Sequence, residues 1–287
     1  PSIGLGASGT GDIASFIAIN VGTSLVTATI TVTPVYTNGS LTCSGTPKSF
    51  TITVNPTPTV NAVTNQVVCN GANTTAVTFG GAVAGTTYLW TNNTPSIGLI
   101  ASGTGNIAAF TAVNTGTSPV TATITVTPRF TNGSAICDGT PTSFTITVNP
   151  TATVNAVSNQ VVCNGGNTTA VTFSSPTTGG AIVYNWTNNN TSIGLGASGT
   201  GDIPSFTAVN TGTAPVSATI TVTPAYTNGS VTCNGTARTF TITVNPTAQV
   251  NTVSNQVVCN GSNVTAINFG TVNTGGTTTY SWTNNNT

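Results

Sequence analysis

The stretch Val26-Thr27-Ala28-Thr29-Ile30-Thr31-Val32 alternates apolar residues with threonine. Because successive side chains of a β-strand point to opposite faces of a sheet, this period of two predicts a strand with one buried face. A second alternating run, Phe50-Thr51-Ile52-Thr53-Val54, follows it, and the Asn38-Gly39 pair between the two favours the positive φ angles of a hairpin turn. No segment shows the apolar stripe of an amphipathic helix, so the sequence predicts an all-β fold.

Several phrases recur three times along the chain at nearly constant intervals. Asn-Gln-Val-Val-Cys ends at positions 94 and 96 residues apart, at Cys69, Cys163 and Cys259. An interval of this length is that of one immunoglobulin-like β-sandwich. The strands expected in one unit are 59–69 (A), 74–79 (B), 86–91 (C), 96–101 (D), 108–113 (E), 119–130 (F) and 143–149 (G). The prediction is therefore a head-to-tail array of immunoglobulin-like repeats of about 94–96 residues each.

The phrase Val-Asn-Pro closes the last strand of each unit and gives the expected boundaries. Residues 1–56 are the C-terminal part of one repeat, 57–150 and 151–246 are complete repeats, and 247–287 are the N-terminal part of a further one. The two outer pieces together have the length of one repeat. We therefore expect the chain to be part of a longer array of repeats, with its two ends lying inside repeats and not at their boundaries.

The composition excludes several classes of function. The chain has three Lys or Arg, three Asp or Glu and no His among its 287 residues. Binding of nucleic acid needs clustered Lys and Arg, and acid–base catalysis needs a titratable group beside a partner, so neither nucleic-acid binding nor enzyme activity is expected. No apolar run approaches the roughly 18–20 residues that span a bilayer, which argues against membrane insertion by this segment.

No cofactor or metal site is predicted. Asp12 and Asp202 occupy equivalent places, but the middle copy has Asn106 there, so a carboxylate is not required by the design of the unit. We expect these residues to bond their own backbone in a turn, with a weak calcium site as the alternative. Zinc lacks His ligands and closely spaced Cys pairs.

The six cysteines fall in two equivalent sets and indicate disulfides and an extracellular location. One set, just after strand F, is Cys43, Cys137 and Cys233; the other, where strand A turns into strand B, is Cys69, Cys163 and Cys259. Within one sandwich these places lie at opposite ends, about 30 Å apart over ten strand residues, whereas a disulfide allows roughly 4.4–6.8 Å between Cα atoms. A bond between repeats, Cys69–Cys233, is favoured; bonds within a repeat, Cys69–Cys137 and Cys163–Cys233, and free buried thiols stay open.

The three tryptophans lie on the expected strand C of their units, at Trp90, Trp186 and Trp282. This is the place of the central core Trp of an immunoglobulin-like sandwich, so we expect all three to pack in a core. Platforms for stacking sugars are the alternative.

Five phrases in fixed order carry a family resemblance: Asn-Gln-Val-Val-Cys-Asn-Gly, Tyr-x-Trp-Thr-Asn-Asn, Ala-Ser-Gly-Thr-Gly-(Asp/Asn)-Ile, Thr-Ile-Thr-Val-Thr-Pro and Phe-Thr-Ile-Thr-Val-Asn-Pro. Together they resemble the PKD-like repeats of giant Bacteroidota cell-surface adhesins, including adhesins of gliding motility. The resemblance implies type IX secretion, attachment to the outer surface, and adhesion to a surface polysaccharide or abiotic substratum, with neighbouring repeats of the same chain as partners. It carries over no ligand residues.

These observations favour a structural and adhesive segment of a long extracellular fibre. Two other hypotheses remain, a lectin-like glycan-binding module and a self-assembling subunit of a surface filament or layer.

Overall fold

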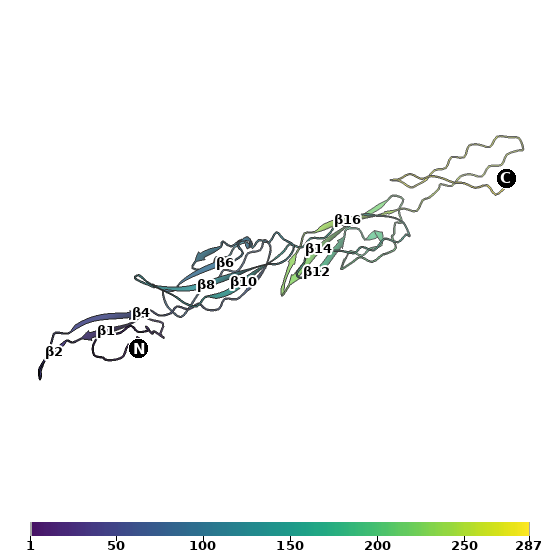
Figure 1. The fold of residues 1–287 in the computed structure, drawn as a ribbon. Helices are drawn as coiled ribbons and strands as arrows, with labels where there is room; N and C mark the ends of the chain where they lie inside the picture. Colours follow the sequence, from purple (N-terminus) through teal and green to yellow (C-terminus); the bar gives the residue numbers. More distant parts are fainter. Residues whose placement is uncertain (1, 287) are drawn as a thin grey trace. The chain divides into compact units, whose positions relative to one another are not determined.

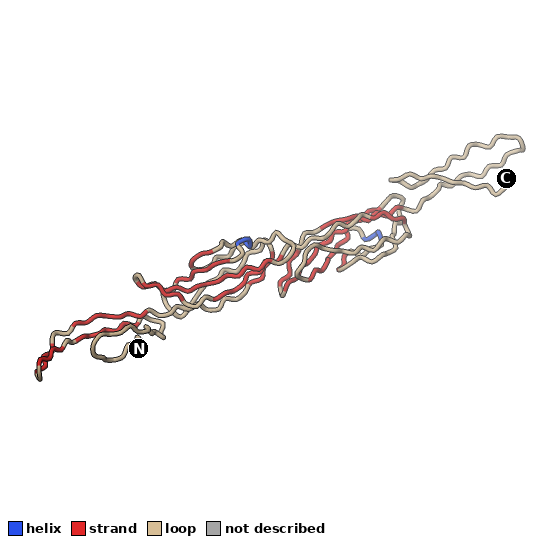
Figure 2. The backbone as a smooth tube through the Cα atoms, in the orientation of Figure 1, coloured by secondary structure: helices blue, strands red, loops and turns tan. Residues whose placement is uncertain are grey.

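The computed structural model describes residues 2–286, which form two compact units. One unit contains the residues up to Asn114 together with Pro119–Asn149, and the other contains Thr115–Ser118 together with the residues from Pro150 onward. Both are built from strands and loops (Figure 2), and the helical structure in the described part is limited to two 3-10 turns, η1 (Pro95–Ile97) and η2 (Thr191–Ile193). The all-β prediction is confirmed.

The main sheet of the first unit has the strand order β5-β10-β8-β6-β7, and β9 pairs with the far end of β8. Figure 1 labels its central strands β10, β8 and β6. All its pairs are antiparallel except β5 and β10, which run parallel. Its strands are β5 (Gln66–Cys69), β6 (Thr87–Asn92), β7 (Ser102–Thr104), β8 (Val120–Asn132), β9 (Ala135–Asp138) and β10 (Thr142–Asn149).

The second unit repeats this topology, with the order β11-β16-β14-β12-β13 and β15 paired with β14. Here β11 and β16 are the parallel pair. Its strands are β11 (Gln160–Cys163), β12 (Ala181–Asn188), β13 (Ser198–Thr200), β14 (Val216–Asn228), β15 (Val231–Asn234) and β16 (Arg238–Asn245).

A second layer faces each main sheet and closes an immunoglobulin-like sandwich. In the first unit it consists of two segments joined at the bridges Asn73↔Thr111 and Val77↔Ile107. The expected strands B and E lie here, but their pairing is limited to these bridges. Between the layers the apolar side chains of both are buried, among them Phe79, Trp90, Ile97, Ile107, Ile124, Val126, Phe144 and Ile146.

The alternation of β8 explains its place at the centre of the sheet. Ala122, Ile124 and Val126 are buried, whereas the threonines between them reach the other face. In the register with β10, Ile124 lies opposite Phe144. On the outer face the hydroxyl groups of Thr121 and Thr147 are 2.9 Å apart, so a cross-strand hydrogen bond accompanies the buried pairs.

Residues 2–56 contain four strands that form two antiparallel pairs. They are β1 (Val26–Val32), β2 (Val35–Asn38), β3 (Leu41–Ser44) and β4 (Lys48–Val54), paired as β1 with β4 and β2 with β3. Phe50 is 47% exposed, whereas Phe144 at the equivalent place of the complete repeat is 2% exposed. The apolar face of this ribbon is therefore not covered as it is in the complete repeats.

The structure corrects the expected strand D at 96–101. The alternation of Ile97 and Leu99 suggested a strand, and both side chains are buried. The backbone instead makes the 3-10 turn η1, which ends at Gly98 with a φ of 98°, and strand pairing resumes at β7. Only glycine adopts this left-handed φ at low cost, so the chain turns where the apolar pattern alone predicted an extended run.

Candidate functional site

Two of the three tryptophans are core residues. Trp90 is 6% exposed and Trp186 is 7% exposed, and Trp90 Nε1 donates to the Gly105 carbonyl at 3.1 Å. Each ring lies against a glycine of the neighbouring strand, Gly103 on β7 or Gly199 on β13, where any Cβ would overlap the ring. These two indoles are enclosed, which leaves no face open for a sugar.

Trp282 differs from the expectation, because it is 75% exposed. At the equivalent position of the second unit, the ring of Trp186 rests against Gly199 of β13.

In the set that contains Cys69 and Cys163, each of these two cysteines ends the strand that runs parallel to strand G. Cys69 is the last residue of β5 and lies in register with Asn149, the last residue of β10. In the second unit Cys163 ends β11 and lies in register with Asn245 of β16. Each of these cysteines is therefore beside the Asn of a Val-Asn-Pro phrase.

The set of Cys43, Cys137 and Cys233 lies in the hairpin that extends strand F, at the other end of the sheet. Cys233 of β15 is opposite Tyr226 of β14, whereas the end of β16 is opposite Val216. Ten residues of β14 separate these two points, or about 33 Å at the rise of a strand. Within one repeat the two cysteine positions are thus too far apart for a disulfide.

The cysteines differ in oxidation state. Cys69 and Cys233 are disulfide-bonded. Cys43, Cys137, Cys163 and Cys259 carry free thiols, so neither bond within a repeat, Cys69–Cys137 or Cys163–Cys233, is present.

Inside the first unit, the end of β4 meets the hairpin of the following repeat. Asn55 accepts a hydrogen bond from Asn132 Nδ2 at 2.9 Å and donates one to Cys137 Sγ at 3.6 Å. Asn55 belongs to the first Val-Asn-Pro phrase, and Cys137 belongs to the hairpin set of cysteines. The Asn that ends one repeat thus contacts the hairpin cysteine of the next.

Glycine lets the linker pack against the same hairpin. A Cβ on Gly139 would overlap the carbonyl oxygen of Pro58, and a Cβ on Gly235 would overlap that of Ala152. In the second repeat the amide of Thr236 also donates to Ala152 O at 2.9 Å. The residues after each proline of Val-Asn-Pro are therefore fixed to the hairpin that carries the cysteine.

The second unit shows a further contact between successive repeats. Thr274 N donates to Thr213 O at 2.9 Å, and Asn273 Nδ2 donates to the same oxygen at 3.4 Å. The amide of Thr178 donates in the same way to Thr117 O at 2.8 Å, and both of these residues belong to the second unit. The interval between the two copies of this bond is the repeat length, so it is a feature of the array.

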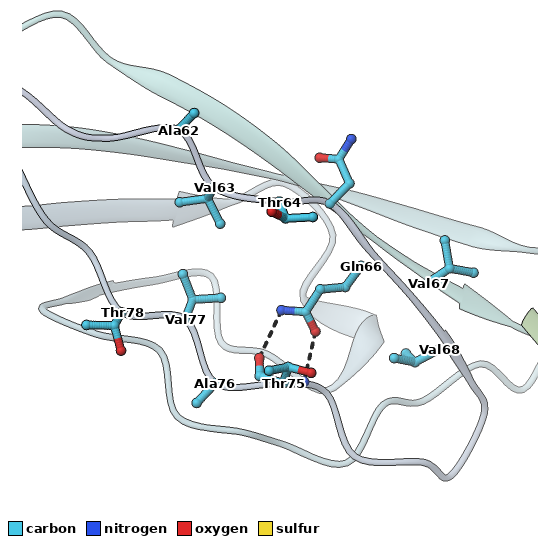
Figure 3. Close-up of a pocket in the computed structure, with 11 residues that line it drawn as sticks. Ala62, Val63, Thr64, Gln66, Val67, Val68, Thr75, Ala76, Val77 and Thr78 are labelled. Carbon is cyan, nitrogen blue, oxygen red and sulfur yellow. Dashed lines mark hydrogen bonds between the residues drawn. The ribbon is translucent and has the colours of Figure 1, made fainter. Parts of the chain in front are cut away.

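A shallow groove of about 540 Å³ runs along the open side of the first sandwich, between residues 62–68 and 75–78 (Figure 3). Gln66 connects its two sides, because its Nε2 donates to Thr75 O and its Oε1 accepts from Thr75 N, both at 2.9 Å. The lining has no charged side chain. Gln160 and Gln256 make the same pair of bonds, with Thr169 and Thr265, so this feature is part of each repeat's structure.

The acidic positions do not bond their own turns as expected. Asn106 Oδ1 accepts from Phe79 N at 3.0 Å, and Asp202 Oδ1 accepts from Phe173 N at 2.9 Å. The amide of Asn106 and the carboxylate of Asp202 thus make equivalent hydrogen bonds, which join the two segments of the second layer. Within residues 2–286 no three His, Cys, Asp or Glu residues gather as metal ligands would.

An ion pair lies on the hairpin of the first complete repeat. Arg129 Nε donates to Asp138 Oδ1 at 2.6 Å and its Nη2 donates to Oδ2 at 2.7 Å. These bonds lower the pKa of Asp138 below its ordinary value and raise that of Arg129. The equivalent residues in the next repeat are Ala225 and Asn234, which also lie opposite each other, so the pair is a local addition to a neutral design.

The sequence did not reveal the part played by the Val-Asn-Pro phrases. Their recurrence was interpreted as the end of a strand, but Asn55 and its equivalents lie beside both sets of cysteines. One signal in the sequence could have indicated this role. The same Asn precedes Pro in all three phrases, although any polar residue could end a strand there.

No family model and no curated protein sequence matches the chain. Among solved structures it is similar to the human desmocollin-1 ectodomain at 11% identity, covering 74% of this chain and 46% of that one with a TM-score of 0.25. It is also similar to the tandem Ig repeats of Dlar, at 16% identity and a TM-score of 0.22, with 66% and 98% covered. Surface layer protein SbsC, domains 1–6, matches at 17% identity and a TM-score of 0.20, with 57% and 21% covered. The chain spans less than half the length of the desmocollin ectodomain.

The described part of the chain contains no helix that is long and apolar enough to cross a membrane.

Proposed function

We propose that this chain is a structural and adhesive segment of a long extracellular bacterial surface fibre, divided into the repeats 57–150 and 151–246 with partial repeats at 1–56 and 247–287. The observation that carries the proposal is that bonding contacts recur at the junctions of a nearly uncharged array. Uncharged repeats can be placed in series without mutual repulsion. The finer resemblance is to the gliding-motility adhesin SprB, and it implies a fibre on the outer surface of a gliding Bacteroidota cell after type IX secretion.

The proposal includes a disulfide between repeats, Cys69–Cys233, and three observations made inside the units support it. Cys69 lies in register with Asn149. Asn55, the equivalent of Asn149 one repeat earlier, contacts the hairpin cysteine of the repeat that follows it. If the next junction repeats this arrangement, the hairpin cysteine that corresponds to Asn149, and therefore to Cys69, is Cys233. Cys69 and Cys233 are also the two oxidised cysteines of the chain.

Non-reducing peptide mapping tests the pairing. We expect one cross-linked peptide pair that contains Cys69 and Cys233, in protein alkylated before digestion to prevent exchange. A Cys69–Cys137 or Cys163–Cys233 peptide would contradict it.

Adhesion is tested on beads coated with the chain. We expect such beads to be retained under flow on a polysaccharide gel or on glass, with beads coated by an unrelated immunoglobulin-like domain of similar charge as the control. Immunogold labelling with an antibody to residues 57–150 should decorate threads that project from the source cell. Retention no greater than that of the control beads, or label confined to the cell interior, would refute the proposal.

A further inference from the structure

We infer that the cysteines link successive repeats into a continuous covalent path that carries tension past the folded cores. This inference rests on the fibre and on the cysteine pairing proposed above, and it adds a mechanical function to them. The path consists of disulfides and of short strand segments between them, and most of each repeat lies outside it.

The places of the cysteines in the repeats give a single pairing rule. Cys69 ends the first strand of the repeat 57–150, and Cys233 lies in the hairpin of the repeat that follows it, 151–246. Applied to every repeat, the rule gives Cys163 and Cys259 partners numbered above 287. It likewise gives Cys43 and Cys137 partners numbered below 1. The rule thus forms one bond within the chain and leaves four thiols unbonded, which are the states that the cysteines have.

The segment between two bonds can be followed inside the first unit. It starts at Cys43, continues along β4, passes through Pro56-Thr57-Pro58, and ends along β5 at Cys69. A chain of this length reaches at most about 90 Å when fully extended. Much of this length is already extended in the fold, because β4 and β5 are strands and both prolines favour extended backbone. The segment therefore has little slack.

Segments of the same length recur from Cys137 to Cys163 and from Cys233 to Cys259. Under tension the load runs along the segment from Cys43 to Cys69 and crosses the disulfide to the segment that begins at Cys233, so it bypasses the segment from Cys137 to Cys163. Residues 70–232 then form a loop closed by Cys69 and Cys233, and this loop contains both Trp cores. Unfolding inside the loop releases no length to the fibre.

The parallel pairing of β5 with β10 gives this arrangement a further consequence. Without disulfides, pulling on the two ends of a repeat draws β5 and β10 in opposite directions and shears the hydrogen bonds between them. With Cys69 bonded to Cys233, β5 lies on the loaded path, whereas β10 lies inside the closed loop and bears no load. The shear between Gln66–Cys69 and Ile146–Asn149 is therefore relieved.

Formation of each bond removes two electrons and two protons from a pair of thiols. An exogenous disulfide, the class of oxidant met by exported proteins as they mature, accepts them and is reduced to two thiols. Reduction of the bonds would thus return the array to the ordinary elasticity of a chain of sandwiches.

Single-molecule stretching of the chain, held by peptide tags at its two ends, tests the inference. The oxidised chain should reach a final contour length shorter by the loop from Cys69 to Cys233, about 560 Å, than the same chain after a phosphine reductant is added. The double variant Cys69→Ser/Cys233→Ser should show the long contour in both conditions. A matched control, in which Cys43, Cys137, Cys163 and Cys259 are all changed to Ser, should behave like the natural chain.

Equal contour lengths before and after reduction would overturn the inference. So would a shortening of only about 240 Å, which is the extended length of the loop that a bond within one repeat would close. The result is independent of adhesion. If coated beads fail to adhere but the contour still changes by the full loop from Cys69 to Cys233, the adhesive function is wrong and the covalent path stands. If the beads adhere and the contour length is unchanged, the covalent path is wrong and the adhesive function stands.

Discussion

At the scale of single residues, the contact between Trp90 and Gly103 determines how closely β6 and β7 pack. We predict that Gly103→Ala destabilises the first complete repeat by about 1–3 kcal/mol, because its Cβ overlaps the indole ring and a close-packed core accepts an added methyl group only by shifting its side chains. Urea unfolding followed by Trp fluorescence measures the change. The control is Gly80→Ala, where the Cβ meets its nearest neighbour, Asn61 Nδ2, at 3.5 Å. Equal stability of the two variants would contradict the prediction.

Arg129 and Asp138 lead to a prediction about pH. Because the guanidinium holds the pKa of Asp138 below its ordinary value, the pair contributes stability above the unfolded pKa of Asp, about 3.9, and this contribution is lost as the pH falls through the lower folded value. In Arg129→Ala the pKa of Asp138 should rise, as measured by carbon NMR of the carboxyl group. Both groups are on the surface, so the effect on stability is small. An unchanged pKa would show that the bidentate bond does not form in solution.

At the scale of elements, the side chain of Gln66 joins two backbone segments that do not pair as strands, because it bonds both the N–H and the C=O of Thr75. Gln66→Ala removes two hydrogen bonds to Thr75, so we predict a loss of about 1–3 kcal/mol and faster hydrogen exchange of the Thr75 amide. Gln66→Glu keeps the acceptor for this amide and should preserve most of its protection. If the alanine variant exchanges no faster at Thr75, the side chain does not hold the two segments together.

Strands C, F and G were predictable from the sequence, and strand C, expected at 86–91, appears as β6 (Thr87–Asn92). Strands F and G were expected at 119–130 and 143–149, and they appear as β8 (Val120–Asn132) and β10 (Thr142–Asn149). Strands A, B, D and E have shorter or interrupted pairing, because turns such as the one at Gly98 depend on backbone angles that an apolar pattern does not specify.

For the candidate site, the sequence could place each cysteine at one end of a sandwich, because strand length converts directly into distance. It could not show that Asn55 lies beside Cys137, since this contact joins elements from different repeats. Nor could it show that Trp282 is exposed, because the burial of a side chain depends on contacts with other elements that the alternation does not specify. Contacts between elements distant in sequence are what the alternation of side chains leaves undetermined.

At the scale of the whole molecule, the near absence of charge leaves packing and covalent bonds as the forces that hold the array. The ion pair of the first complete repeat has uncharged counterparts at Ala225 and Asn234, where the same hairpin forms without it. Stability of the repeats should therefore depend little on salt. What distinguishes one state of the array from another is the oxidation of its cysteines.

The last prediction concerns this dependence on oxidation. A bond from Cys69 to Cys233 closes a loop that is longer than one repeat and lowers the entropy of the unfolded chain, so its loss should cost roughly 2–4 kcal/mol. Added reductant should lower the midpoint of thermal unfolding, followed by the fluorescence of Trp90 and Trp186, in the natural chain but not in Cys69→Ser/Cys233→Ser. The variant with serine at the four free positions should respond as the natural chain does. A midpoint that falls equally in all three would mean that the reductant acts elsewhere, because the loop closed by this bond is the one feature that the double variant lacks.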